Sequence, residues 1–232
     1  MEKLAYVLWK PEAQSSQAFR AQLVDEVAPQ LRAAGAANVQ ISAVDDAVAA
    51  GEKLRLDGGV DAKDAFATFW LEQSQEAGDC QALLASVSSQ LAGFLVVESR
   101  PLPNPHLKPH LKPGARTPGF SLCTCIVKRS DITRERFIEL WYDVHRDVAI
   151  DTQSTFSYVR NEIVRALTPG APAWDAIVEE GFPIEALDDP RAFYDAVGDE
   201  ARFEEHLRQM IESCEAFIDL ERVSSQPMSQ YS

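Results

Sequence analysis

The same order of expected strands and helices occurs twice in this 232-residue chain, and this repetition limits the possible folds more than any single motif does. In the first half, alternating and helical patterns of apolar residues predict strands at residues 3–9, 38–44, 65–71 and 91–98, and helices at residues 16–34 and 79–88. In the second half they predict strands at residues 120–128, 158–167, 176–182 and 216–223, helices at residues 133–147 and 201–213, and an extra short helix near residues 190–196. Each half therefore has the order βαββαβ.

Individual residues support the duplication at a constant offset of 118 positions. The first helices of the two halves align without a gap in this register. The corresponding pairs are Lys10 and Lys128, Phe19 and Phe137, Leu23 and Trp141, and Val27 and His145. The first half thus has plain apolar residues where the second half has a tryptophan and a histidine, so packing alone does not require the imidazole.

A proline-rich stretch at residues 100–117, RPLPNPHLKPHLKPGART, separates the two halves. Proline fixes φ and removes a hydrogen-bond donor, so we expect an extended connector. His106 and His110 lie four apart in it, but an extended segment does not form the helical metal clamp, and we expect no metal site. The expected division is a first half at residues 1–99, the linker, a second half at residues 118–223 and a flexible C-terminal tail at residues 224–232.

A βαββαβ unit forms a four-stranded antiparallel sheet with both helices on one face, which leaves the other face of the sheet to be covered. Two such sheets packed face to face make a closed, barrel-like core. The duplication would build this pair within one chain. The expected fold class is therefore α+β, with an antiparallel β-barrel inside and helices outside.

The composition argues against polyanionic partners. The formal charge is -14 and the pI is about 4.7, whereas nucleic-acid binding relies on Lys and Arg that neutralise phosphates. We therefore expect neither nucleic acid nor an anionic membrane as a partner. No N-terminal segment resembles a secretion signal, and the longest apolar runs are too short to span a bilayer, so the expected location is the cytoplasm. The four cysteines lack zinc-ligand spacing, and we expect reduced, buried thiols.

The stretch from residue 134 to residue 151 carries the group best suited to chemistry. Phe137, Trp141 and His145 follow one another at steps of four, and His145 lies at the margin of the apolar face. Imidazole titrates near neutral pH. This position predicts a partly desolvated general acid or base in a mostly apolar pocket between helix and sheet, with Trp141 as a wall. The alternative is a helix-margin histidine bonded to a backbone carbonyl.

Further candidates surround this helix. Asp151 could orient His145, and either Tyr158 or Asn161 could donate a hydrogen bond to a substrate carbonyl or phenol. Glu179 and Glu180 alternate on a strand, so only one can face inward, where burial would raise its pKa. The catalytic candidates are His145, Tyr158, Asn161 and Asp151, and the substrate-binding candidates are Phe137, Trp141, Trp174, Glu179 and Phe182. Core packing is the alternative for the aromatic residues.

With this helix and the duplication, the sequence resembles the EthD-like branch of the dimeric α/β-barrel superfamily, in a tandem form. The resemblance rests on the F-x-x-x-W-x-x-x-H helix and on residues 158–161 and 174–182. It implies two ferredoxin-like halves. The superfamily includes cofactor-free monooxygenases, lactone isomerases, polyketide cyclases and haem enzymes, and some EthD-like proteins are linked to degradation of xenobiotics. Such a fold does not define one reaction.

The predicted function is binding of a small hydrophobic or aromatic oxygenated metabolite, with cofactor-free acid/base chemistry such as isomerisation, cyclisation or decarboxylation, or a role in xenobiotic degradation. One alternative is a non-catalytic binding or structural protein with a vestigial pocket. Another is a haem protein with His145 as axial ligand. Motifs for NAD(P), ATP, serine hydrolases and zinc proteases are missing, and we expect no cofactor. Two chains could form a homodimer through exposed strand edges.

Overall fold

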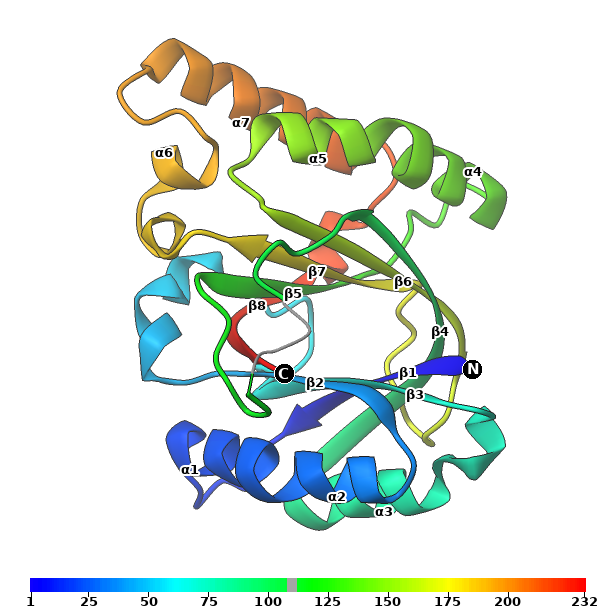
Figure 1. Ribbon diagram of the computed structural model, residues 1–232. Helices are drawn as coiled ribbons and strands as arrows, with labels where there is room; N and C mark the ends of the chain where they lie inside the picture. The colour runs from blue at the N-terminus through cyan, green and yellow to red at the C-terminus, as the bar shows by residue number, and fades with distance from the viewer. Residues whose placement is uncertain (108–111) are drawn as a thin grey trace.

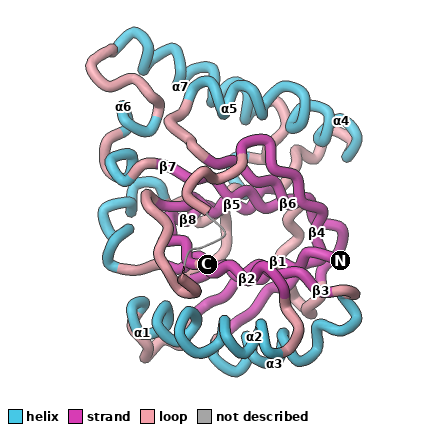
Figure 2. The backbone as a smooth tube through the Cα atoms, viewed as in Figure 1, coloured by secondary structure: helices cyan, strands magenta, loops and turns pink. Residues whose placement is uncertain are grey.

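Eight strands form one closed antiparallel barrel in the order β1-β3-β2-β8-β5-β7-β6-β4, and this confirms the predicted fold class. The computed structural model describes residues 1–107 and 112–232. Helices α1, α2 and α3 cover one side of the barrel, and α4, α5 and α7 cover the opposite side (Figure 1). The tube in Figure 2 shows the strands as an inner ring between these two helical layers.

The first half contains β1 (Glu2–Trp9), α1 (Ser16–Ala21), η1 (Gln22–Val27), α2 (Ala28–Ala33), β2 (Ala37–Ala43), η2 (Asp46–Leu54), β3 (Ala65–Leu71), η3 (Ser74–Ala77), α3 (Gly78–Val87) and β4 (Gln90–Leu102). The second half contains β5 (Phe120–Ile126), α4 (Arg134–Glu139), η4 (Leu140–His145), α5 (Arg146–Thr152), β6 (Ser157–Ala166), β7 (Ala176–Phe182), η5 (Ile184–Leu187), α6 (Pro190–Phe193), α7 (Glu200–Glu215), η6 (Leu220–Arg222) and β8 (Ser224–Tyr231).

The two halves share local hydrogen bonds as well as element order. The backbone N–H of Lys10 donates to the Asp64 carboxylate at 2.9 Å, and the backbone N–H of Lys128 donates to the Asp175 carboxylate at 2.8 Å. Each first helix also has a hydroxyl N-cap, because the Ser15 side chain and its counterpart in the second half accept a backbone N–H three residues ahead. The same sequence signals thus start the same structure twice.

Both first helices are interrupted by a π-helical segment at corresponding residues. The segments are η1 and η4, and their bounds differ by the same offset of 118 positions. We expected uninterrupted helices over residues 16–34 and 133–147, and the π-helical segments correct this expectation. A π-helical turn widens the backbone and changes which side chains face the sheet, and such turns are frequent at functional sites. Trp141 and His145 both lie in η4.

The C-terminal residues form a strand, and the predicted flexible tail at residues 224–232 is wrong. Strand β8 lies between β2 and β5, and all of its residues are buried. Its sequence, SSQPMSQY, lacks the alternation of apolar residues that is typical of a strand, and it includes a proline, which is rare in central strands. Its hydroxyls are satisfied by the protein, as in the bond from Ser229 Oγ to the Asp45 carboxylate at 2.8 Å. The strand expected at residues 216–223 instead contains a loop and η6.

Closure of the ring gives every strand two hydrogen-bonded neighbours. Among the described residues, no strand of the barrel lacks a neighbour on either side, so the closed ring contradicts the prediction of a homodimer formed through free edge strands. Strand β4 extends to Leu102, so the connector begins later than residue 100. It packs on the barrel, where the ring of His106 meets the edge of Phe156 at 4.8 Å, whereas His110 lies outside the described residues.

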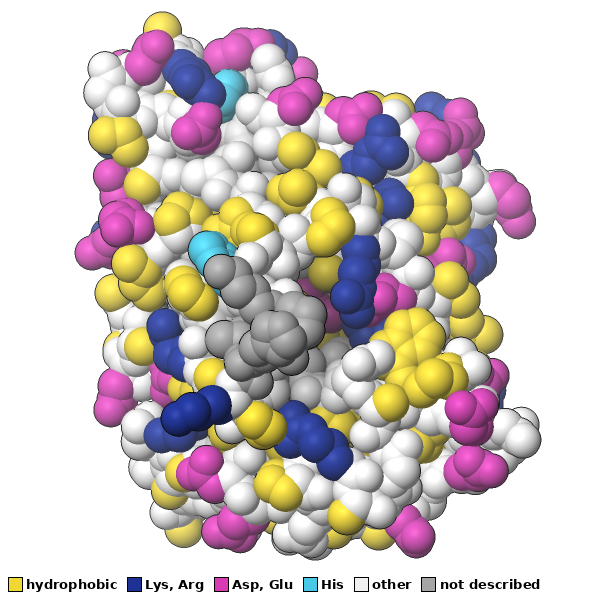
Figure 3. Space-filling model, viewed as in Figure 1, with side chains coloured by type: hydrophobic (Ala, Val, Ile, Leu, Met, Phe, Trp, Pro, Cys, Tyr) yellow, Lys and Arg dark blue, Asp and Glu magenta, His cyan; other side chains and the backbone are white. Residues whose placement is uncertain are grey.

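On the face shown in Figure 3, side chains of both charges are interspersed with isolated apolar ones, so the net negative charge does not form one continuous acidic surface there. Within the described residues, no helix combines the length and the apolar character needed to cross a bilayer.

A buried ionic network joins the two halves inside the barrel. Lys3 Nζ forms ion pairs with Glu98 and, at 3.4 Å, with Glu179, and it donates to Asn161 Oδ1 at 2.8 Å. Asn161 Nδ2 in turn donates to Glu179 Oε1 at 3.0 Å. Lys3 and Glu98 belong to the first half, and Asn161 and Glu179 to the second. The network therefore helps to set how the two sheets face each other.

We expect Lys3→Met to lower the free energy of unfolding by about 3–5 kcal/mol, because it leaves the buried Glu179 carboxylate without its cation. Urea denaturation measures this loss, and Lys112→Met, at an exposed position, is the matched control. A double variant that also carries Glu179→Gln should recover part of the loss. A single variant as stable as the control would contradict the structural role of the network.

Candidate functional site

A cavity of about 430 Å³ lies between the second-half sheet and the helices that cover it. This volume falls in the range of small-molecule sites. Its walls are mostly apolar, and its polar groups include His145, Tyr158 and Glu180. The first half contributes Lys53, Leu54 and Leu56 to one side of the cavity. The site therefore belongs mainly to one half of the duplication, but the other half completes its wall.

The imidazole of His145 is 8 % exposed and faces this cavity from η4. Its Nδ1 lies 2.9 Å from Ser213 Oγ on α7, and its ring lies 4.9 Å from the ring of Phe217. Burial, together with the nearby Arg160 cation, lowers the pKa of His145 to about 4. At neutral pH the ring is therefore uncharged. Its Nε2 has no hydrogen-bond partner among the described residues.

The carboxyl group of Glu180 faces the same cavity from the centre of β7. Its cross-strand neighbours are Leu122 on β5 and Tyr158 on β6. Burial raises the pKa of Glu180 to about 8, so the group is protonated at neutral pH. Among the described residues, no hydrogen bond or ion pair engages this carboxyl. Glu180 keeps a partly accessible surface because it lines the cavity.

Tyr158 and Trp141 line the cavity and are 1 % and 0 % exposed. Trp141 Nε1 donates to the Tyr158 hydroxyl at 3.0 Å. Because the hydroxyl oxygen accepts this bond, its own hydrogen remains available to another acceptor. Burial and the nearby Glu180 raise the pKa of Tyr158. The guanidinium of Arg160 lies 3.6 Å from the ring centre of Tyr142 and 5.8 Å from the ring centre of Trp141.

Three predicted polar residues lie away from the cavity. Asn161 and Glu179 point into the barrel interior, because alternation along β6 and β7 places them on the face opposite Tyr158 and Glu180. Asp151 is exposed at the end of α5 and does not bond to His145, whose Nδ1 is next to Ser213. The assignment of these three residues to the His145 site is therefore corrected.

Three predicted aromatic residues are core residues and do not line the cavity. Phe137 packs between Trp141 and Phe217, with ring centres 5.5 and 5.6 Å away. Trp174 faces the barrel interior and meets Phe94 at 5.7 Å. The third, Phe182, is fully buried between two other phenylalanine rings. The structure thus brings together Trp141, His145 and Tyr158 from the predicted set.

The sequence interpretation did not place Ser213, Phe217 or residues 53–56 at the site. These residues come from elements whose contact with η4 depends on tertiary packing. Of the two alternating carboxylates Glu179 and Glu180, the sequence interpretation assigned Glu179 to the substrate-binding site. The cross-strand pairing of Glu180 with Tyr158 is the signal that selects it, and this pairing exists only in the folded sheet.

The cysteines do not form a reactive pair. All four are unpaired thiols, and Cys214 is the one that lines the cavity. Burial and the nearby Glu180 raise the pKa of Cys214 to about 12, which keeps its thiol protonated. Within residues 1–107 and 112–232, no three His, Cys, Asp or Glu side chains are grouped so that they could hold a metal ion.

Two βαββαβ halves that close one barrel, with a cavity between sheet and helices, give the chain the fold of a dimeric α/β-barrel in tandem form. Residues 129–221, within the second half of the chain, match the EthD domain. The matched segment contains η4 and β7, which carry His145 and Glu180.

Solved structures share this fold at low sequence identity. An anthrone oxidase-like protein is similar with a TM-score of 0.58 and 12 % identity, over 100 % of this chain and 91 % of the other. A mutant chlorite dismutase from Candidatus Nitrospira defluvii, in complex with cyanide, is similar with a TM-score of 0.51 and 10 % identity, over 100 % and 91 % of the two chains. No curated protein sequence matches the chain. Identities this low establish a shared fold alone.

Proposed function

We propose that the cavity binds a small hydrophobic or aromatic oxygenated metabolite and that His145 and Glu180 transfer protons on it without a cofactor. One observation carries this proposal: an uncharged imidazole and a protonated carboxyl line the same apolar cavity. Environments that move two pKa values in opposite directions are typical of paired bases and acids. The shared fold with an anthrone oxidase-like protein is consistent with a ligand of this kind.

The arrangement suits proton transfer next to a carbonyl group. His145 Nε2 would take a proton from the carbon beside the carbonyl, and the electron pair of that C–H bond would form a C=C bond. The carbonyl oxygen would gain negative charge, which the O–H groups of Tyr158 and Glu180 would stabilise by hydrogen bonds. Return of the proton to a different carbon completes an isomerisation. Cyclisation and decarboxylation use the same stabilised oxygen.

Exchange of carbon-bound hydrogen tests this proposal without knowledge of the natural substrate. We expect the protein to accelerate exchange of the acidic hydrogens of aromatic ketones such as β-tetralone in deuterium oxide, followed by proton NMR. Saturation of the rate with ketone would show that exchange occurs in a bound complex. Ketone binding without accelerated exchange would instead favour the non-catalytic alternative, and neither binding nor exchange across a panel of such ketones would contradict the proposal.

The rate should depend on pH as a bell-shaped curve. His145 must be uncharged to accept a proton, so kcat/KM should fall as the pH drops through about 4. Glu180 must be protonated to donate, so kcat/KM should fall again as the pH rises through about 8. Glu180→Gln keeps an N–H donor that does not titrate in this range, and the fall at high pH should disappear. A wild-type curve that stays level from pH 6 to pH 10 would contradict the role of Glu180.

The cavity residues do not fit haem, which was the second alternative. Among the described residues, Lys53 is the one Lys or Arg side chain in the cavity lining, so the two propionates of a haem would have a single cationic partner there. We expect titration with hemin to produce no new Soret band, and a stoichiometric band that is lost in His145→Ala would contradict this conclusion.

A further inference from the structure

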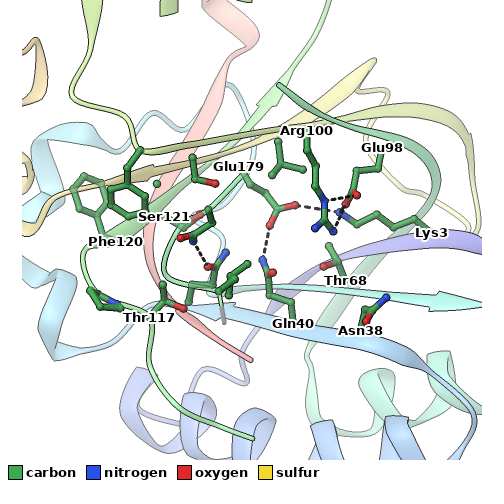
Figure 4. A pocket seen from close by; sticks show the side chains of 18 of the residues that line it. Lys3, Asn38, Gln40, Thr68, Glu98, Arg100, Thr117, Phe120, Ser121 and Glu179 are labelled. Carbon is green, nitrogen blue, oxygen red and sulfur yellow. Dashed lines mark hydrogen bonds and ion pairs between the residues drawn. The ribbon is translucent and has the colours of Figure 1, made fainter. Parts of the chain in front are cut away.

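A second hollow opens at one end of the barrel interior, on the face of the second-half sheet opposite the His145 cavity. All eight strands contribute residues to its lining, and Figure 4 shows these side chains directed toward a shared space. Its volume is about 40 Å³. A single water position needs about 10–15 Å³ on this measure, so the hollow accommodates a group of about three heavy atoms.

The charged groups of this hollow already neutralise one another. Lys3 pairs with Glu98 and Glu179, and Arg100 pairs with Glu98 (Figure 4). Lys3 and Glu179 are only 4 % and 3 % exposed. An ionic ligand would have to compete with these buried pairs, and separating a buried pair is costly. The hollow therefore favours an uncharged ligand.

The remaining polar groups have unused hydrogen-bonding capacity. Thr117 lines the hollow and is 2 % exposed, and its buried Oγ1 has no hydrogen-bond partner in the described part of the chain. Buried hydroxyls are rarely left unpaired, so this one points to a ligand or bound solvent. The side chains of Thr68 and Asn38 line the same space and make no hydrogen bond with the described residues. Hydroxyl and amide groups both donate and accept, as do the hydroxyls of a polyol.

The backbone also directs side chains toward this hollow. Asn38 has a φ of 50°, in the left-handed region, and the pairing of β2 with β3 shifts register between Ala37 and Gln40. Such a bulge changes the direction of the side chains beside it. Phe120, Phe156 and Trp70 line the hollow as well and offer ring surface to C–H groups.

We propose that this hollow is a second ligand site, which binds the diol end of a small uncharged polyhydroxylated molecule. One ligand hydroxyl would accept from, or donate to, Thr117 Oγ1, and the next would reach the amide and hydroxyl groups of β2 and β3. Glu179 and Glu180, which are neighbours on β7, would then face two different sites. This proposal does not depend on the chemistry proposed for His145.

Glycerol is the probe that tests this site in solution. We expect saturable chemical-shift changes in an NMR titration, with an affinity at least about 5-fold higher than for n-propanol, sodium acetate or methylammonium chloride, because only glycerol supplies uncharged vicinal hydroxyls. A crystal soaked in glycerol should show an oxygen of the ligand within hydrogen-bond distance of Thr117 Oγ1. Tighter binding of acetate or methylammonium, or no saturation with glycerol, would overturn the proposal.

A matched pair of variants separates this site from the first cavity. Thr117→Val removes the unpaired hydroxyl at nearly constant shape, and we expect glycerol affinity to fall about 2- to 13-fold. Thr124→Val makes the same change in the His145 cavity and should leave glycerol affinity unchanged. Unfolding in urea should confirm that both variants are folded. Equal glycerol affinity in Thr117→Val and wild type, or a crystal that contains only water in the hollow, would show adventitious solvation and overturn the proposal.

Discussion

His145→Ala is expected to slow ketone hydrogen exchange by about 10²- to 10⁴-fold, because it removes the base that accepts the carbon-bound proton. The ketone itself should still bind, since the apolar walls and the two O–H donors of Tyr158 and Glu180 remain. Exchange is measured by proton NMR in deuterium oxide, and binding by tryptophan fluorescence, because Trp141 lines the cavity.

The first half of the chain supplies the matched control for this variant. Val27 occupies the position that corresponds to His145, is 3 % exposed and lies in the equivalent π-helical segment. Val27→Ala should destabilise the fold through lost packing but leave the exchange rate per folded molecule unchanged. If His145→Ala retained the wild-type rate, or if both variants slowed exchange equally, His145 would not be the base.

A chain that ends at Val223 is expected not to fold. Strand β8 closes the barrel between β2 and β5, so its removal leaves two strand edges open and exposes the barrel interior. It also removes Met228, which is 0 % exposed, and the hydroxyls of Ser229 and Tyr231, which donate to the buried Asp45 carboxylate. Circular dichroism and size-exclusion chromatography should show loss of cooperative unfolding and aggregation of the shortened chain.

Removal of Ser232 alone is the control for this truncation, because the pairing of β8 with its neighbouring strands ends at Tyr231. That chain should remain folded. Cooperative unfolding of the chain ending at Val223, with a midpoint near that of the full chain, would contradict the closing role of β8.

Much of the fold follows from local patterns. Residues at a constant offset start equivalent helices, and the paired Lys10–Asp64 and Lys128–Asp175 bonds show that equivalent sequence produces equivalent turns. Local patterns did not predict strand β8, because most of its side chains are polar. They can be buried because neighbouring strands and Asp45 supply hydrogen-bond partners. The periodicity of apolar residues along the chain does not reveal such partners.

Only part of the candidate site could be predicted from the sequence. The η4 positions of Trp141 and His145 could be read from the spacing along one helix, since helical spacing is a local property. The choice between Glu179 and Glu180 could not, because alternation shows that the two carboxyls point apart but not which one meets the helices. The register of β7 against β6 decides it, by setting Glu180 opposite Tyr158.

The sequence by itself determined the duplicated βαββαβ order and the antiparallel barrel expected from it. It also determined that a histidine, His145, occurs in one half only, since the corresponding residue of the other half is Val27. The tertiary structure alone decided that residues 224–231 close the ring, that Ser213 meets His145, and that Glu179 and Glu180 face two separate spaces. The physical reason is the range of the interactions. Periodicity and capping act within a few residues, whereas strand register, burial and the resulting pKa values depend on groups far apart in the chain.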